Sequence, residues 1–135
     1  MEFGTINILA VVVSAVAAIL VGFIWFSPPL FEKAWLEDIG RTREQIEGDS
    51  PLKYLVAFIG SLLMAYIVAR LLDLVGGPSL EMGILLAVVV WVAFVAATSA
   101  ANFAFAGRPV RLWLIENGNH LLTLLVMGVI LGVWV

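Results

Sequence analysis

Four runs of apolar residues, each long enough to cross a lipid bilayer, dominate this sequence of 135 residues. A transmembrane helix needs about 20 mostly apolar residues to cross about 30 Å of hydrocarbon. The predicted spans cover residues 6–26, 52–75, 80–106 and 109–135. The five prolines fall at the predicted boundaries, where a missing backbone N–H breaks no helical hydrogen bond. We therefore predict an all-α membrane protein whose single domain, residues 1–135, is a four-helix transmembrane bundle with a short amphipathic cytoplasmic segment between helices 1 and 2.

The composition agrees with a chain that dissolves in lipid. Hydrophobic residues make up 63% of the chain and charged residues only 13%, whereas about 25% of the residues in a soluble domain are charged. Seven Lys and Arg against ten Asp and Glu leave a net charge of -3, which has the wrong sign for a protein that binds nucleic acid. The expected partner is the lipid bilayer, and no nucleic acid partner is expected.

The basic residues predict how the chain is oriented. The segment after the first span and the turn after the third span hold six of the seven basic residues: Lys33, Arg41, Arg43, Lys53, Arg108 and Arg111. Only Arg70 is expected on the opposite side. Because cytoplasmic loops carry the excess of Lys and Arg, we expect a multi-pass protein of the cell membrane whose N- and C-termini are both extracytoplasmic. The start, Met1-Glu2, lacks the basic residues of a cleavable signal peptide, so we expect the first span to remain in the protein.

The segment between the first two spans has a pattern of its own. Phe31, Trp35 and Ile39 recur every four residues after Trp25 ends the first span, which predicts a short amphipathic helix on the membrane surface. Thr42-Arg43-Glu44-Gln45 fits a capping box that opens a second short helix. Two interpretations stay open. The segment either spaces the first span from the second, or docks a partner protein through residues 31–48. Its expected interfacial residues are Trp25, Phe31 and Trp35.

Small residues recur at helical spacing in every span, and close contact over small residues is what holds helices together in lipid. They are Ala10, Ser14, Ala18 and Gly22 in the first span, Ala57, Ser61, Ala65 and Ala69 in the second, and Gly128 and Gly132 in the fourth. The third span has two adjacent stripes: Ala93, Ala97 and Ala101, and Ala96, Ala100 and Ala104. We expect this third span either to lie at the centre of the bundle or to contact another protomer, and we expect a homo-oligomer.

Polar residues within two spans form the candidate site. They are Thr98, Ser99 and Asn102 in the third span and Glu116, Asn117, Asn119 and His120 in the fourth. Glu116 and His120 are four residues apart and therefore share a helix face. A charge at mid-bilayer costs about 2.5 to 3.5 kcal/mol on insertion scales, so we expect these side chains to face the protein interior, a partner or water.

Two interpretations of this polar cluster remain. It either binds or passes a small solute or a proton, or it is a hydrogen-bonded plug that joins helices three and four. A bare carboxylate at Glu116 is disfavoured in lipid unless His120, Arg108 or Arg111 brings a positive charge beside it. Glu116 and His120 alone are too few ligands for a zinc site, and the chain has no Cys. No nucleophile with a matched base is evident either, so we expect no enzyme, no metal and no cofactor.

Three motifs together resemble a known family. They are Trp25-Phe26-Ser27-Pro28 followed by Phe31 and Trp35, then Asn102-x-x-Phe105-x-Gly107-Arg108-Pro109, and finally Asn117-Gly118-x-His120. Over nearly the whole chain they resemble the small four-span membrane proteins grouped as DUF1761, a domain of unknown function. The resemblance implies a four-span fold and a membrane location, and it carries no catalytic role. Glu116 and Asn119 depart from the family's pattern, so the resemblance implies no role for them.

Overall fold

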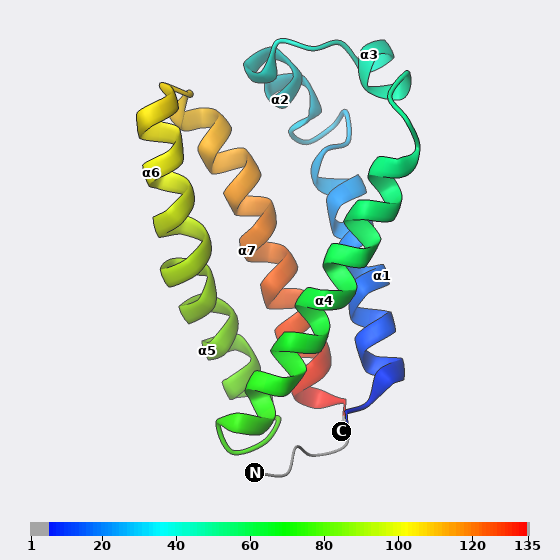
Figure 1. The fold of residues 1–135 in the computed structure, drawn as a ribbon, viewed down its shortest axis with the longest axis vertical. Coiled ribbons are helices and arrows are strands. Elements are labelled where there is room, and N and C mark those ends of the chain that lie inside the picture. The colour runs from blue at the N-terminus through cyan, green and yellow to red at the C-terminus, as the bar shows by residue number, and fades with distance from the viewer. Residues whose placement is uncertain (1–5, 135) are drawn as a thin grey trace.

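The computed structural model describes residues 6–134 and confirms the four-span helical architecture (Figure 1). Four helical segments are long and apolar enough to cross a membrane: Ile8–Trp25, Leu52–Leu74, Leu80–Ala106 and Val110–Val133. They are α1 (Ile8–Trp25), α4 (Leu52–Leu74), the third span made of α5 (Leu80–Val90), η1 (Trp91–Ala96) and α6 (Ala97–Ala106), and α7 (Val110–Val133). Each lies within its predicted span.

The ends of these helices follow from local capping. The Asn7 side chain accepts a hydrogen bond from the Ala10 N–H at the start of α1, and Ser79 caps α5 through the Met82 N–H in the same way. Gly107 ends α6 with a φ of 68°, a left-handed conformation that glycine adopts without strain. Pro109 then precedes α7.

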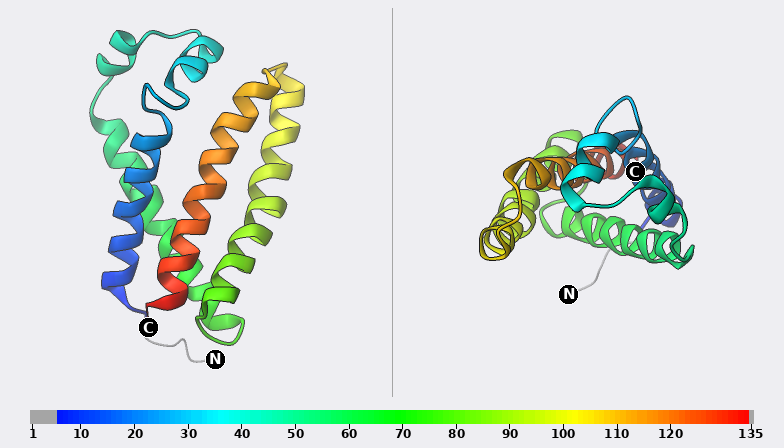
Figure 2. Two further views of the ribbon diagram at one scale, coloured as in Figure 1. Left: turned by 180° about the vertical axis from the view of Figure 1, so that it is seen from behind. Right: turned by 90° about the horizontal axis from the view of Figure 1, so that it is seen from above.

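The segment between α1 and α4 forms two short helices, α2 (Glu32–Ile39) and α3 (Arg43–Glu47). The predicted capping box is confirmed, because Thr42 accepts from the Gln45 N–H and the Gln45 side chain accepts from the Thr42 N–H. Gly40 separates the two helices with a φ of 70°. Both lie at the end of the molecule where α6 turns into α7 (Figures 1 and 2), so the two predicted loops share one end of the bundle.

The fourth span, not the third, is the central helix. Helix α7 packs against α1, α4, α5 and α2 (Figure 2), and nine of its residues are buried. Within α6, all of whose residues the structure describes, only Phe103 is buried. Of the two alternatives for the third span, the central position is therefore wrong, and contact with another protomer stays a prediction. Its alanine stripes over Ala97 and Ala101 face outward and stay exposed in the single chain.

Glycines bring α5 and α7 into backbone contact. A Cβ added at Gly83 would overlap the Gly128 backbone, and one added at Gly128 would overlap the Gly83 backbone. Gly132 lies equally close to the Ser79 carbonyl. The predicted Gly128 and Gly132 pair therefore lies at a helix crossing, where small residues permit close approach.

Small residues also lie between α1 and α4. Ala10 and Ser14 of α1, and Ala65 of α4, are fully buried at this helix pair. The bundle is therefore closed by small residues at the end that holds the start of α1 and the end of α7.

Candidate functional site

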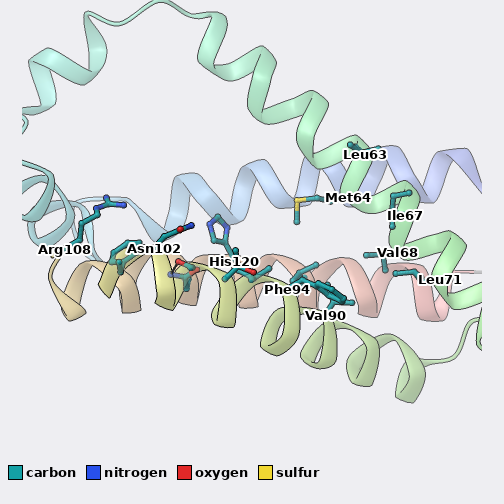
Figure 3. A pocket seen from close by; sticks show the side chains of 16 residues that line it. Leu63, Met64, Ile67, Val68, Leu71, Val90, Phe94, Asn102, Arg108 and His120 are labelled. Atoms are coloured by element: carbon teal, nitrogen blue, oxygen red, sulfur yellow. Dashed lines mark hydrogen bonds between the residues drawn. The ribbon is translucent and has the colours of Figure 1, made fainter. Parts of the chain in front are cut away.

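A cavity of about 650 Å³ lies between α4, the third span and α7 (Figure 3). Its lining combines ten apolar side chains with six polar or charged ones. The apolar ones are Leu63, Met64, Ile67, Val68, Leu71, Val90, Phe94, Val95, Phe103 and Leu124, and the polar or charged ones are Thr98, Ser99, Asn102, Arg108, Asn117 and His120. Its size is within the range of about 300 to 1,000 Å³ typical of small-molecule sites.

Five of the seven predicted site residues line this cavity. They are Thr98, Ser99 and Asn102 from α6, and Asn117 and His120 from α7. Arg108 lines it as well, although the sequence pattern did not predict it as a site residue. From the sequence, Arg108 was expected to mark orientation and was one of three candidates to bring a positive charge beside Glu116. Nothing in the spacing shows that its side chain lies over the Phe103 ring, 4.3 Å from the ring centre.

Asn117 joins the third and fourth spans. Its side chain is 2% exposed, and its Nδ2 donates to the Ser99 Oγ at 2.9 Å and to the Trp113 carbonyl at 2.9 Å. Its own backbone carbonyl accepts from the Trp91 Nε1 at 2.8 Å. This part of the cluster matches the plug interpretation, since the amide hydrogen bonds two helices together.

Two tryptophans hold the same stretch of α7 from opposite helices. The Trp25 Nε1 of α1 donates to the Ile115 carbonyl at 2.8 Å, while Trp91 donates to Asn117 from the first residue of η1. Gly118 makes room for the Trp25 ring, because a Cβ there would lie 3.0 Å from the ring. The segment η1 is a π-helix, a distortion that often marks functional sites. Here it carries the indole that contacts the polar cluster.

Glu116 does not line the cavity with His120. Its Oε1 lies 3.5 Å from the Arg108 guanidinium and accepts from the Trp35 Nε1 at 3.4 Å. The positive charge expected beside Glu116 is therefore supplied by Arg108. Asn119 also lies outside the cavity lining, and its Oδ1 is buried with no hydrogen-bond partner among residues 6–134. The structure thus separates Glu116 and Asn119 from the other five candidates.

The predicted interfacial residues contact their own chain. The Trp25 and Phe31 rings lie 4.6 Å apart between centres, and the Phe26 and Trp35 rings lie 4.9 Å apart. These contacts and the hydrogen bond from Trp35 to Glu116 fold the α1–α2 connection onto α7.

Helix α2 is also tied to α7 by charge. The Arg111 guanidinium lies 2.7 Å from Asp38 and 3.4 Å from Glu37. The hydrogen bonds that Arg111 donates lower the pKa of the Asp38 carboxyl below its usual 3.8. The contact is therefore between two charged groups at neutral pH.

The chemistry available in the cavity is hydrogen bonding, one guanidinium and one imidazole. Among residues 6–134, no group of three or more acidic or His side chains is placed to hold a metal ion. The arrangement suits the binding of a molecule through polar atoms at one end and apolar surface at the other.

Comparison with known proteins places the chain in a family. No curated protein and no solved structure matches it. A family described as "Protein of unknown function (DUF1761)" matches residues 9–132, which span all four transmembrane helices. The chain belongs to the DUF1761 family of proteins of unknown function.

Proposed function

We propose that this integral membrane protein binds a small solute in the cavity between α4, α6 and α7. The observation that carries the proposal is that polar side chains gather at one end of an otherwise apolar cavity. A plug that only joined two helices would need the bond between Asn117 and Ser99. Thr98, Asn102 and His120 instead line open space, where polar groups in a membrane protein need water or a ligand as their partner.

The site supports binding more directly than passage across the membrane. The backbone contact of Gly83 with Gly128 closes the bundle at the end away from α2 and α3. A solute that crosses the membrane would therefore need this contact to open. We further propose that proton binding to the His120 imidazole, which lines the cavity, is coupled to the site.

Docking of a partner protein through the segment between α1 and α4 is the weaker candidate. Trp25, Phe31 and Trp35 already contact other aromatic rings or α7 within the same chain. A partner would have to displace these contacts. The aromatic residues of this segment therefore support an internal role.

The proposal also covers the membrane in which the protein lies, the orientation of the chain in it and the oligomeric state. We place the protein in the cell membrane with α2, α3 and the α6–α7 turn in the cytoplasm, because six of the seven basic residues lie at that end. Fusion of a reporter after Val135 that is active only outside the cytoplasm tests this. We also propose a homo-oligomer, and native mass spectrometry from lipid nanodiscs tests that.

Cysteine labelling tests whether the polar end of the cavity is a real opening. The chain has no Cys, so a single introduced thiol is a clean reporter. Thr98→Cys lies in the cavity lining, and its neighbour Ala97→Cys lies at the same depth on the exposed face of α6. A membrane-impermeant thiol reagent should label Thr98→Cys at least about tenfold faster than Ala97→Cys, because a thiol in lipid cannot ionise. Equal rates at the two positions would contradict the proposed site.

A further inference from the structure

We infer that the ligand of this cavity is an anionic amphiphile with a single acyl chain, such as a fatty acid, that enters from the side of the bilayer. The inference rests on the proposed function and names its ligand class. It is drawn from the order of the lining residues, the charge at the polar end and the exposure at the rim.

The lining is divided along the length of the cavity. Figure 3 shows Arg108 and Asn102 at one end, His120 near the middle, and Val68, Leu71 and Val90 toward the other end. Val90 and Asn102 are twelve positions apart in the chain, which corresponds to about 18 Å of helix. An extended molecule with a polar head and an apolar tail matches this division, whereas a compact polar solute would leave the apolar half without a partner.

The charges at the polar end favour an anionic head. Arg108 is the charged side chain in the lining of the cavity, beside the His120 imidazole, and among the described residues 6–134 no carboxylate lines it. Glu116 neutralises Arg108 only in part, because their closest atoms are 3.5 Å apart and the Arg108 side chain is 41% exposed. A guanidinium and side-chain amides are suitable donors to a carboxylate oxygen.

The size and the rim indicate how the ligand enters and how many chains it has. A cavity of about 650 Å³ suits one acyl chain with its head group rather than a two-chain phospholipid. Phe94 lines the cavity and is 72% exposed, so the cavity opens on the lipid-facing side of the third span. Helix α4 and the third span lie close together near the α4–α5 turn and diverge toward the end that holds α2 and α3 (Figure 1). The acyl chain can therefore enter from the bilayer beside Phe94, through the gap between α4 and the third span.

Protection of the introduced thiol tests this ligand class. The full chain carrying Thr98→Cys is placed in phosphatidylcholine nanodiscs and labelled in the presence of dodecanoate, dodecyltrimethylammonium or butyrate. Dodecanoate should slow labelling about tenfold, as expected for one hydrogen-bonded charge contact. The cationic probe has the same chain but the wrong charge, and butyrate has the right head but a short chain, so both should slow labelling by less than about twofold.

Second-site variants separate the head from the tail. Combined with Thr98→Cys, Arg108→Gln should abolish most of the protection, and Arg108→Lys should restore part of it. Ile67→Trp, at a lining position that is 46% exposed, should fill the apolar half and abolish protection, whereas Val56→Trp, which is exposed on the same helix outside the cavity, should not.

The outcomes distinguish the inference from the proposed function. If Thr98→Cys is labelled in preference to Ala97→Cys but dodecanoate gives no protection, the inferred ligand class is wrong and the proposed solute-binding site still stands. If dodecyltrimethylammonium protects as well as dodecanoate, the anionic head is wrong. If Thr98→Cys in a chain that elutes as the wild type is not labelled in preference to Ala97→Cys, both are wrong.

Discussion

Gly118 and Trp25 show how a single glycine positions the polar cluster. The Trp25 ring lies over Gly118, and its indole N–H reaches the Ile115 carbonyl one turn earlier on α7. A Cβ at residue 118 would lie 3.0 Å from the ring, so the ring would have to shift by a few tenths of an ångström. The glycine therefore lets the ring pack closely against α7, and the tryptophan supplies a donor that ties α1 to the middle of α7.

Removing either partner should weaken the bundle. Trp25→Phe keeps an aromatic ring but loses the N–H, and should lower the free energy of unfolding by about 1 kcal/mol. Gly118→Val also displaces the ring, and should cost about 1 to 3 kcal/mol. Trp134→Phe, at the exposed C-terminal end, is the matched control and should change little. The free energy of unfolding is measured by circular dichroism in mixed micelles. If Trp25→Phe leaves this free energy unchanged, the indole N–H does not stabilise the bundle.

The bond between Asn117 and Ser99 should be measurable as a coupling. A double-mutant cycle with Asn117→Ala and Ser99→Ala should give about 0.6 to 1.7 kcal/mol, the range found for hydrogen bonds between membrane helices. The same cycle on Asn117 and Ser61, which is buried on α4, serves as control and should give a value near zero. Additive effects for the first pair would mean that the bond does not stabilise the contact of α6 with α7.

At the scale of helices, the α5–α7 crossing depends on glycine. Gly128→Ala would bring a methyl group into the Gly83 backbone and should destabilise the protein by about 1 to 3 kcal/mol. Gly60→Ala on α4 meets no atom within 4 Å and should be neutral or stabilising by about 0.5 to 1 kcal/mol, since alanine is the better helix former. The thermal stability of the two variants in one detergent checks this prediction. If both variants lose the same stability, the α5–α7 crossing does not require glycine at residue 128.

Helix α2 should leave α7 in acid. The pKa of Asp38 is lowered by Arg111, so the stabilisation is present above its usual 3.8 and is lost as pH falls through the lower folded value. The distribution of distances between spin labels at Lys33 and Val110 should stay constant from about pH 8 to about pH 4 and broaden only below 3.8, the usual pKa of an Asp carboxyl. Asp38→Asn should broaden it at every pH. An acid-insensitive distance in the wild type would contradict the charge contact.

The helices themselves were predictable because each is determined by residues that are close together in the sequence. Long apolar runs and caps such as Ser79 and Gly107 are read directly from neighbouring residues. The π-helix from Trp91 to Ala96 was not predicted. Its residues are ordinary apolar ones, and its distortion accompanies a hydrogen bond to Asn117, which lies 26 residues away in the chain.

At the scale of the whole molecule, the sequence pattern could not show which helices are neighbours in the bundle. Small-residue stripes show that a helix approaches something closely, but they do not name its neighbour. The alanines of α6 are exposed, while the glycines of α7 lie at a crossing. The candidate site was predicted in part for the same reason. The sequence showed that seven polar residues lie at a similar depth in the membrane. It did not show the direction of each side chain, and in the structure His120 lines the cavity whereas Glu116 contacts Trp35.

An experimental structure in a phosphatidylcholine nanodisc supplemented with dodecanoate tests the central claim most directly. We predict an open volume between α4, α6 and α7, with elongated density whose polar end lies against Arg108 and Asn102. A structure in which α4 is packed directly on α6, with His120 facing acyl chains and no volume between the helices, would contradict it.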